Sequence, residues 1–189
     1  SVFSIVFPAI LFSQVPLRDW KFATGDDAAR SNPAFDDAVW KTISPSKIWE
    51  EQGYEGYNGY AWYRIHFFLP SAIREKASLK EDVRISLCHI DDVDESFLNG
   101  IKIGGMGRFP TDPAGYSTEW RVLREYVIPA DHPALKWDAD NVIAVRVYDD
   151  NGGGGLWGAE AYLSVLSRID YVKMDAATHP VSISEKSVS

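Results

Sequence analysis

Residues 90–104 read IDDVDESFLNGIKIG, and this stretch indicates the fold more clearly than any other part of the chain. An acidic run at 91–95 precedes two short segments, 96–98 and 101–103, which the dipeptide Asn99-Gly100 separates. Asn-Gly favours a type I′ turn, because both central residues of that turn need a positive φ. The stretch therefore predicts an acidic loop that leads into a tight antiparallel hairpin at one end of a β-sandwich.

Short alternating patterns recur along the rest of the chain. The clearest runs over 61–69, where Tyr63, Ile65 and Phe67 are apolar and lie between residues of the other face. Further strand patterns lie at 20–22, 83–87, 120–128 and 161–166, a near-continuous apolar run lies at 141–148, and loops rich in turn residues separate them. Strands at this spacing, without a long amphipathic helix, predict an all-β sandwich.

Composition and charge narrow the class of protein. The chain has 189 residues, which is long enough for one domain with a sizeable core. Its net charge of −8 argues against nucleic acid and against anionic membranes as partners, because both require a basic surface. Cys88 is the single cysteine, so no intrachain disulfide can form, and its apolar surroundings predict a buried small side chain.

Residues 90–104 resemble part of the sugar-binding domain of glycoside hydrolase family 2 enzymes. Several further segments of this chain resemble other parts of that domain, and they occur in the same order along the sequence as in the family. Similar domains occur in sialate O-acetylesterases and β-galactosidase-like proteins. The segments are Asp19-Trp20-Lys21-Phe22, Phe35-Asp36-Asp37-Ala38-Val39-Trp40, Ala61-Trp62-Tyr63-Arg64, Arg124-Glu125-Tyr126-Val127-Ile128-Pro129, Asn141-Val142-Ile143-Ala144-Val145-Arg146-Val147 and Gly153-Gly154-Gly155.

The resemblance implies a jelly-roll β-sandwich of the galactose-binding-like type. It also implies a carbohydrate-binding or accessory module of a glycoside hydrolase or carbohydrate esterase that is not catalytic by itself. Its partners would be a glycan and an adjacent catalytic domain, and its location would be secreted, periplasmic or at the cell surface. Two alternatives stay open: a module that only packs on neighbouring domains, and a stand-alone glycosidase that uses the 91–95 cluster with Glu119 or Asp149.

Three regions of the chain are distinguished by composition. Residues 1–16 are mostly apolar and are interpreted either as the remnant of a signal peptide or as an edge strand. Residues 17–170 carry the strand patterns and form the expected jelly-roll domain. Residues 171–189 form a polar C-terminal tail.

Candidate ligand-binding residues are aromatic side chains that could stack on a sugar ring and charged side chains that could bind its hydroxyl groups. They are Tyr57, Tyr60, Trp62, Arg64, Asp91, Asp92, Asp94, Arg124 and Asp149. Trp49, Trp120 and Trp157 lie near predicted loops and could line the same site. The acidic run has three interpretations: ion pairing with arginines such as Arg64 and Arg146, binding of a ligand or Ca²⁺, or acid–base catalysis.

No catalytic residue is predicted. The four histidines are scattered without metal-ligand spacing, and no G-x-S-x-G nucleophile motif occurs. No cofactor is expected other than a structural Ca²⁺, which galactose-binding-like domains often hold through backbone carbonyls. The sequence leaves the position of such a metal site open.

Overall fold

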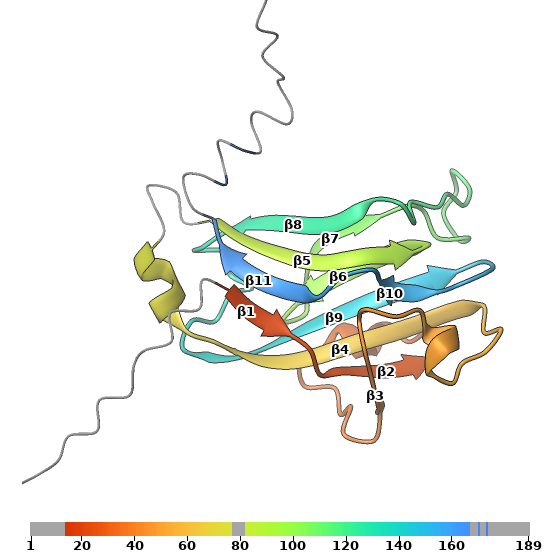
Figure 1. Ribbon diagram of the computed structural model, residues 1–189, viewed down its shortest axis with the longest axis horizontal. Coiled ribbons are helices and arrows are strands. Elements are labelled where there is room, and N and C mark those ends of the chain that lie inside the picture. Colours follow the sequence, from red (N-terminus) through yellow and green to blue (C-terminus); the bar gives the residue numbers. More distant parts are fainter. Residues whose placement is uncertain (1–13, 77–81, 167–169, 171–172, 174–189) are drawn as a thin grey trace, which may run out of the picture.

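The computed structural model describes residues 14–76, 82–166, 170 and 173, and it confirms an all-β sandwich of two antiparallel sheets (Figure 1). The first sheet contains β1 (Gln14–Leu17), β11 (Ala161–Val165), β5 (Asp82–Asp91), β10 (Gly155–Trp157) and β8 (Leu123–Pro129). The second sheet has the order β3 (Lys41–Ile43), β2 (Trp20–Thr24), β4 (Gly59–Leu69), β9 (Ala139–Asp149), β6 (Val93–Leu98) and β7 (Ile101–Met106). Three short 3-10 helices lie in connections: η1 (Ala28–Ser31), η2 (Trp49–Gln52) and η3 (Ser71–Lys76).

The core lies between the two sheets and follows the alternation read from the sequence. In β4, Tyr63, Ile65 and Phe67 are buried in the core, while His66 and Phe68 on the other face are exposed. β4 pairs with β9 over eleven residues, from Gly59 with Asp149 to Leu69 with Ala139. This long pair forms the centre of the second sheet. It places the start of β4 and the end of β9 together at one end of the sandwich.

The predicted hairpin is present. β6 and β7 pair in antiparallel fashion, and the turn residues Asn99 and Gly100 have φ values of 49° and 84°. The positive φ at both positions agrees with the expected turn chemistry.

The acidic run differs from the loop that the sequence predicted. Asp91 is the last residue of β5, Asp94 and Glu95 belong to β6, and Asp92 is the single residue between these strands. The chain therefore crosses from the first sheet to the second within this run. Because β6 alternates, Asp94 is buried whereas Glu95 on the opposite face is half-buried.

The N-terminal segment joins the sandwich earlier than the predicted boundary at residue 17. β1 begins at Gln14 and pairs with β11 as an edge strand of the first sheet. Residues 1–13 of the segment predicted as a signal-peptide remnant or edge strand (1–16) lie outside the described residues, and so does the predicted tail apart from Lys173. Among the described residues, no helix is long and apolar enough to cross a membrane.

Cys88 is buried, as its apolar surroundings predicted. Burial, aided by the charge of Glu160, raises the pKa of its thiol to about 12, so the thiolate that reacts as a nucleophile is scarce at neutral pH.

Candidate functional site

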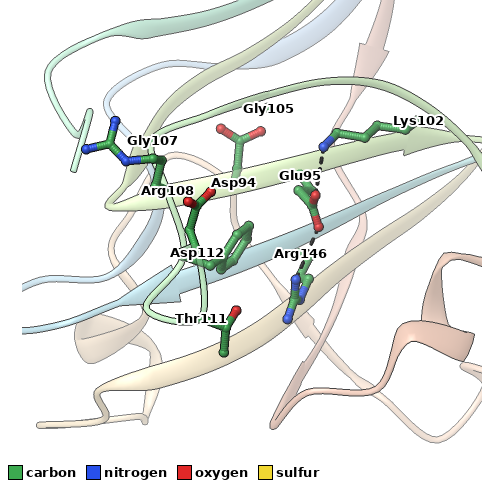
Figure 2. Close-up of a pocket in the computed structure, with 10 residues that line it drawn as sticks. Asp94, Glu95, Lys102, Gly105, Gly107, Arg108, Thr111, Asp112 and Arg146 are labelled. Atoms are coloured by element: carbon green, nitrogen blue, oxygen red, sulfur yellow. Dashed lines mark hydrogen bonds and ion pairs between the residues drawn. The ribbon is translucent and has the colours of Figure 1, made fainter. Parts of the chain in front are cut away.

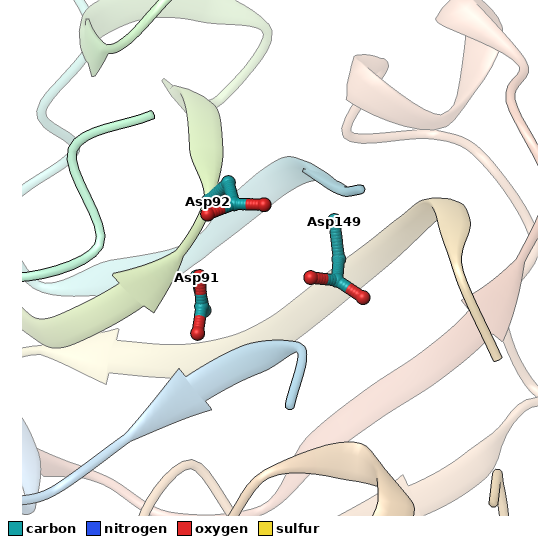
Figure 3. Close-up of side chains that lie close together, drawn as sticks. All are labelled: Asp91, Asp92 and Asp149. Atoms are coloured by element: carbon teal, nitrogen blue, oxygen red, sulfur yellow. The ribbon is translucent and has the colours of Figure 1, made fainter. Parts of the chain in front are cut away.

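An acidic cluster occupies the end of the sandwich where β5 and β9 finish, at the right of Figure 1. It contains Asp91 from the end of β5, Asp149 from the end of β9, and Asp92 (Figure 3). One carboxylate oxygen from each of the three residues lies within 4.8 Å of the others. We call these three residues the acidic cluster.

The three carboxylates differ in their hydrogen bonds. Asp92 accepts bonds from the Tyr116 hydroxyl (2.7 Å), the Thr118 hydroxyl and the backbone N–H of Asp150 (3.0 Å). Asp149 is 0% exposed, and neither of its oxygens accepts a hydrogen bond of good geometry among the described residues. The Asn151 backbone N–H nevertheless acts on Asp149 enough to favour its charged form. Asp149 is therefore the least satisfied acid of the cluster.

Burial and mutual repulsion separate the pKa values of the cluster. Burial, the hydrogen bond with Asp92 and the neighbouring negative charges raise the pKa of Asp91 to about 8. Burial, followed by the charges of Asp92 and Glu50, raises the pKa of Asp149 to about 7. Burial opposes ionisation of Asp92 as well, but bonds from Asp91, Thr118 and Tyr116 hold its pKa below the usual range. Without a counter-ion, this end of the molecule therefore holds more protons than three ordinary aspartates.

An aromatic group lies next to the acidic cluster. Trp157 in β10 pairs in register with His89 in β5, two residues before Asp91 along that strand. The Trp157 ring stacks on His89 at 4.8 Å and contacts Trp120 at 6.3 Å between ring centroids. Trp120 is 36% exposed, and the Arg121 guanidinium lies over its ring at 4.5 Å from the centroid. Of the three tryptophans named from the sequence as possible walls, Trp120 and Trp157 converge here, whereas Trp49 is buried in the core.

Asp94 and Arg124 are brought together inside the sandwich, away from solvent. Arg124 Nε donates to Asp94 Oδ1 at 2.8 Å, and both side chains are 0% exposed. The same carboxylate accepts bonds from the Tyr126 hydroxyl and from Ser96. This satisfied network is ion pairing of the kind that the sequence offers as one interpretation of the acidic run. Asp94 pairs with Arg124, which is not named from the sequence for this role. Glu95 of the same run pairs with Arg146, which is named for it.

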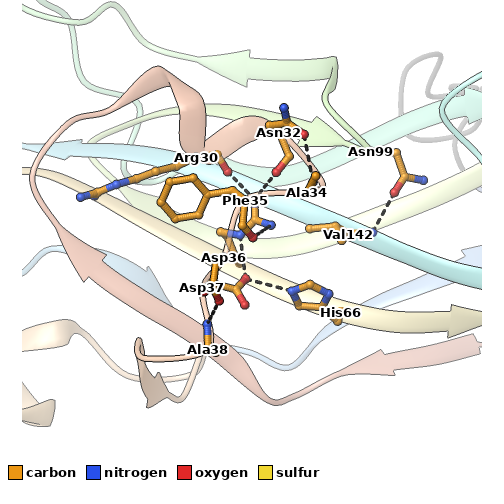
Figure 4. Close-up of polar contacts among 11 residues, drawn as sticks. Arg30, Asn32, Ala34, Phe35, Asp36, Asp37, Ala38, His66, Asn99 and Val142 are labelled. Atoms are coloured by element: carbon orange, nitrogen blue, oxygen red, sulfur yellow. Dashed lines mark hydrogen bonds and ion pairs between the residues drawn. The ribbon is translucent and has the colours of Figure 1, made fainter.

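Arg64 pairs with an acid outside the acidic run. It is buried beneath the 30–37 loop and donates to Asp37 at 2.7 Å and to backbone carbonyls of that loop. Asp37 also bonds His66 at 2.9 Å (Figure 4). Trp62, on the same face of β4, is 1% exposed, stacks on Phe97 and offers no free ring face to a ligand in this arrangement.

Tyr57 and Tyr60 lie in structural contacts at the start of β4. Tyr57 packs against the core and its hydroxyl donates to the Tyr60 carbonyl. The Tyr60 ring stacks on Phe109, and the Arg146 guanidinium lies over both rings. The Tyr60 ring also contacts Tyr148 at 4.8 Å, and the Tyr148 ring contacts Tyr116, which donates to Asp92 of the acidic cluster.

A second polar feature lies on the outer face of the second sheet, beside the 107–112 loop. It is a hollow of about 300 Å³ in which Glu95 bonds both Lys102 (2.7 Å) and Arg146 (3.2 Å) (Figure 2). Arg146 also pairs with Asp26 at 2.6 Å. The charged groups that meet here already neutralise one another, which distinguishes the hollow from the acidic cluster.

Sequence reasoning did not identify Tyr116, Thr118 and Glu50 as parts of the site. Tyr116 and Thr118 belong to a long connection without a strand pattern, and Glu50 lies in the short helix η2. The Glu50 Oε2 atom accepts a bond from the Gly154 backbone at 3.0 Å, whereas Oε1 is buried and has no partner in the described part of the chain. No local signal distinguishes these residues, because only the fold brings them to the cluster.

A β-sandwich with a polar and aromatic end defines the class of the molecule, and comparison with known proteins narrows it. No family model matches the sequence. The chain is 28% identical over 151 residues to "Beta-galactosidase BoGH2A" of Bacteroides ovatus, which covers 74% of this chain and 16% of that protein. It is 25% identical over 147 residues to a "Beta-glucuronidase" of Formosa agariphila, which covers 71% of this chain and 13% of that protein.

Solved structures show the same fold. A β-glucuronidase of Bacteroides uniformis superimposes with a TM-score of 0.60 at 22% identity, over 82% of this chain and 18% of that one. A glycosyl hydrolase family 2 member of Bacteroides cellulosilyticus gives a TM-score of 0.61 at 20% identity, over 82% and 21%. The chain thus spans less than a quarter of each of these relatives, and it is similar to one domain of family 2 glycoside hydrolases, as the motifs predicted.

Proposed function

We propose that this domain is a non-catalytic carbohydrate-recognition module that works beside the catalytic domain of a glycoside hydrolase. Its correspondence to a small part of larger family 2 enzymes supports the association with glycoside hydrolases. The observation that carries the recognition role is the half-exposed Trp120–Trp157 pair next to the acidic cluster. An aromatic face accommodates the C–H side of a sugar ring, and nearby polar side chains accept bonds from its hydroxyl groups.

The burial of the acidic cluster supports a non-catalytic role. A glycosidase pair needs carboxyl groups about 5–9.5 Å apart on either side of an open cleft. Here the carboxylate oxygens of the three aspartates lie within 4.8 Å, Asp149 is 0% exposed and Asp92 is 6% exposed. The three carboxylates are thus closer together than a glycosidase pair, and two of them are buried. The raised pKa values of Asp91 and Asp149 follow from burial rather than from an arrangement around a substrate.

The test is a glycan array with the folded chain and with Trp120→Ala, including galactosides and uronic-acid-containing oligosaccharides. We expect binding by the unmodified chain and a loss of about five- to thirtyfold in affinity for Trp120→Ala, since stacking on one aromatic ring contributes roughly 1–2 kcal/mol. Phe68→Ala is the matched control, because Phe68 is an aromatic residue of the other sheet that is 53% exposed. Equal binding by both variants would contradict the assignment of the platform.

A docking role without glycan affinity is the second candidate. Val122, Leu123 and Val127 are 39%, 42% and 41% exposed, and Leu123 and Val127 lie on the outward face of β8. Apolar side chains gathered on one strand are typical of a surface that contacts another domain. If a chain that is shown to be folded binds no glycan on the array, the docking role is favoured.

A further inference from the structure

We propose that the acidic cluster of Asp91, Asp92 and Asp149 is a binding site for one Ca²⁺ ion. The proposal concerns the metal alone and does not depend on glycan recognition.

Geometry is the first support. Ca²⁺ binds oxygen ligands at about 2.3–2.6 Å, so two oxygens on the same ion lie at most about 5 Å apart. The three carboxylates meet this condition, since one oxygen from each lies within 4.8 Å of the others. All three donors are oxygens, and hard cations such as Ca²⁺ prefer such a set over zinc or copper, which favour nitrogen and sulfur.

The unsatisfied state of Asp149 is the second and independent support. Both of its oxygens are buried without a hydrogen-bond partner of good geometry among the described residues, as is Glu50 Oε1 at the same end of the sandwich. Buried carboxylates are stable only when they are paired, bound to a metal or protonated. Among the described residues, the buried acids Asp37 and Asp94 have arginine partners at 2.7 and 2.8 Å. Buried Asp92 instead accepts hydrogen bonds from Tyr116, Thr118 and the Asp150 backbone. Asp149 is the remaining buried aspartate there, and it has neither an arginine partner nor a hydrogen bond of good geometry.

The surroundings of the cluster favour a metal ion, rather than an arginine side chain, as the positive charge that neutralises it. The positive charge of Arg124 acts on Asp91, but the Arg124 nitrogens are already bound to Asp94 and to the carbonyls of Ile90, Glu119, Asp92 and Val122. Tyr116 and Thr118 hold Asp92 in place by hydrogen bonds to both of its oxygens. The Asp92 side chain is therefore oriented by groups outside the cluster, which is the role of the second layer of residues around a metal site.

The experiment measures Ca²⁺ binding by metal-free protein with calorimetry and with thermal unfolding. We expect one Ca²⁺ per chain. At a Ca²⁺ concentration about 100 times Kd, the unfolding midpoint should rise by about 5–10 °C. Mg²⁺ serves as a second probe and should bind more weakly, because it demands a stricter octahedral geometry.

Two variants test the ligands. Asp149→Asn and Asp91→Asn each keep the shape of the side chain and remove its charge, and we expect at least tenfold weaker binding in both. Glu55→Gln is the matched control, since it removes the same charge from an exposed position and should bind Ca²⁺ normally. Circular dichroism of each metal-free variant establishes that it folds, and Asp91→Asn serves if Asp149→Asn does not. Absence of saturable binding by the unmodified chain, or unchanged affinity in a folded Asp149→Asn or Asp91→Asn variant, would overturn the proposal.

Discussion

At the scale of single residues, the buried charges of this domain are stabilised by partners distant in sequence. Arg64 lies in the centre of β4 and is neutralised by Asp37 of the connecting loop, as Arg124 is by Asp94. Removing one member of such a pair leaves an uncompensated buried charge and costs more than the pair contributes. These arginines therefore fix loops to the sheets. Their replacement should lower the stability of the domain rather than act directly on ligand binding.

Asp37 gives a prediction on pH. Burial opposes its ionisation, but bonds from Arg64 and His66 hold its pKa below the usual range. A lowered folded pKa gives stability that is present above the unfolded pKa of about 3.9 and is lost as pH falls through the folded pKa. We expect Asp37→Asn to cost about 3 kcal/mol at neutral pH and to weaken the decline of stability below about pH 4. Urea denaturation over a pH series checks this. Parallel pH profiles for both proteins would contradict it.

At the scale of elements, the hairpin between β6 and β7 depends on backbone conformation as well as on packing. Gly100 has a φ of 84°, and a Cβ atom at this position would lie 3.1 Å from Pro33 Cδ. The turn therefore lies against the 30–37 loop that also covers Arg64. A change in the turn is transmitted to that loop by direct contact.

Gly100→Ala and Gly56→Ala separate these two effects. Both glycines have positive φ, but nothing lies within 4 Å of a Cβ at Gly56. We expect Gly56→Ala to cost about 1 kcal/mol, from the left-handed conformation alone, and Gly100→Ala to cost about 1 kcal/mol more, from the contact with Pro33. Chemical denaturation of the two variants measures the difference. Equal losses of unfolding free energy in the two variants would mean that the 30–37 loop moves away from the added methyl group without loss of stability.

At the scale of the whole molecule, the two sheets present different outer faces. The second sheet is covered in part by the 26–37 loop and by neutralised charges, whereas β8 of the first sheet exposes apolar side chains beside the Trp120–Trp157 pair. The relatives are several times longer than this chain and carry further domains, so a surface of this kind suits contact with a neighbour.

The double variant Leu123→Ser/Val127→Ser tests that contact. In the isolated chain we expect its free energy of unfolding to change by less than about 0.5 kcal/mol, because both residues face solvent there. In a protein that joins the chain to a catalytic domain, the same change should lower the midpoint of thermal unfolding of this domain. Phe68→Ser, on the other sheet, is the control. An effect of equal size from both variants would argue against docking through β8.

The sequence by itself determined the strands, the hairpin turn and the likeness to a family 2 domain. These features depend on local signals, such as the alternation in 61–69 and the positive φ that Asn99-Gly100 accommodates. The tertiary structure decided which charged and aromatic residues meet. Asp149 lies 57 residues from Asp92, and Trp157 lies 37 residues from Trp120, so no spacing rule connects them. Only the pairing of β5 with β10, and the shared end of β5 and β9, brings them together, because strand register is set by long-range packing.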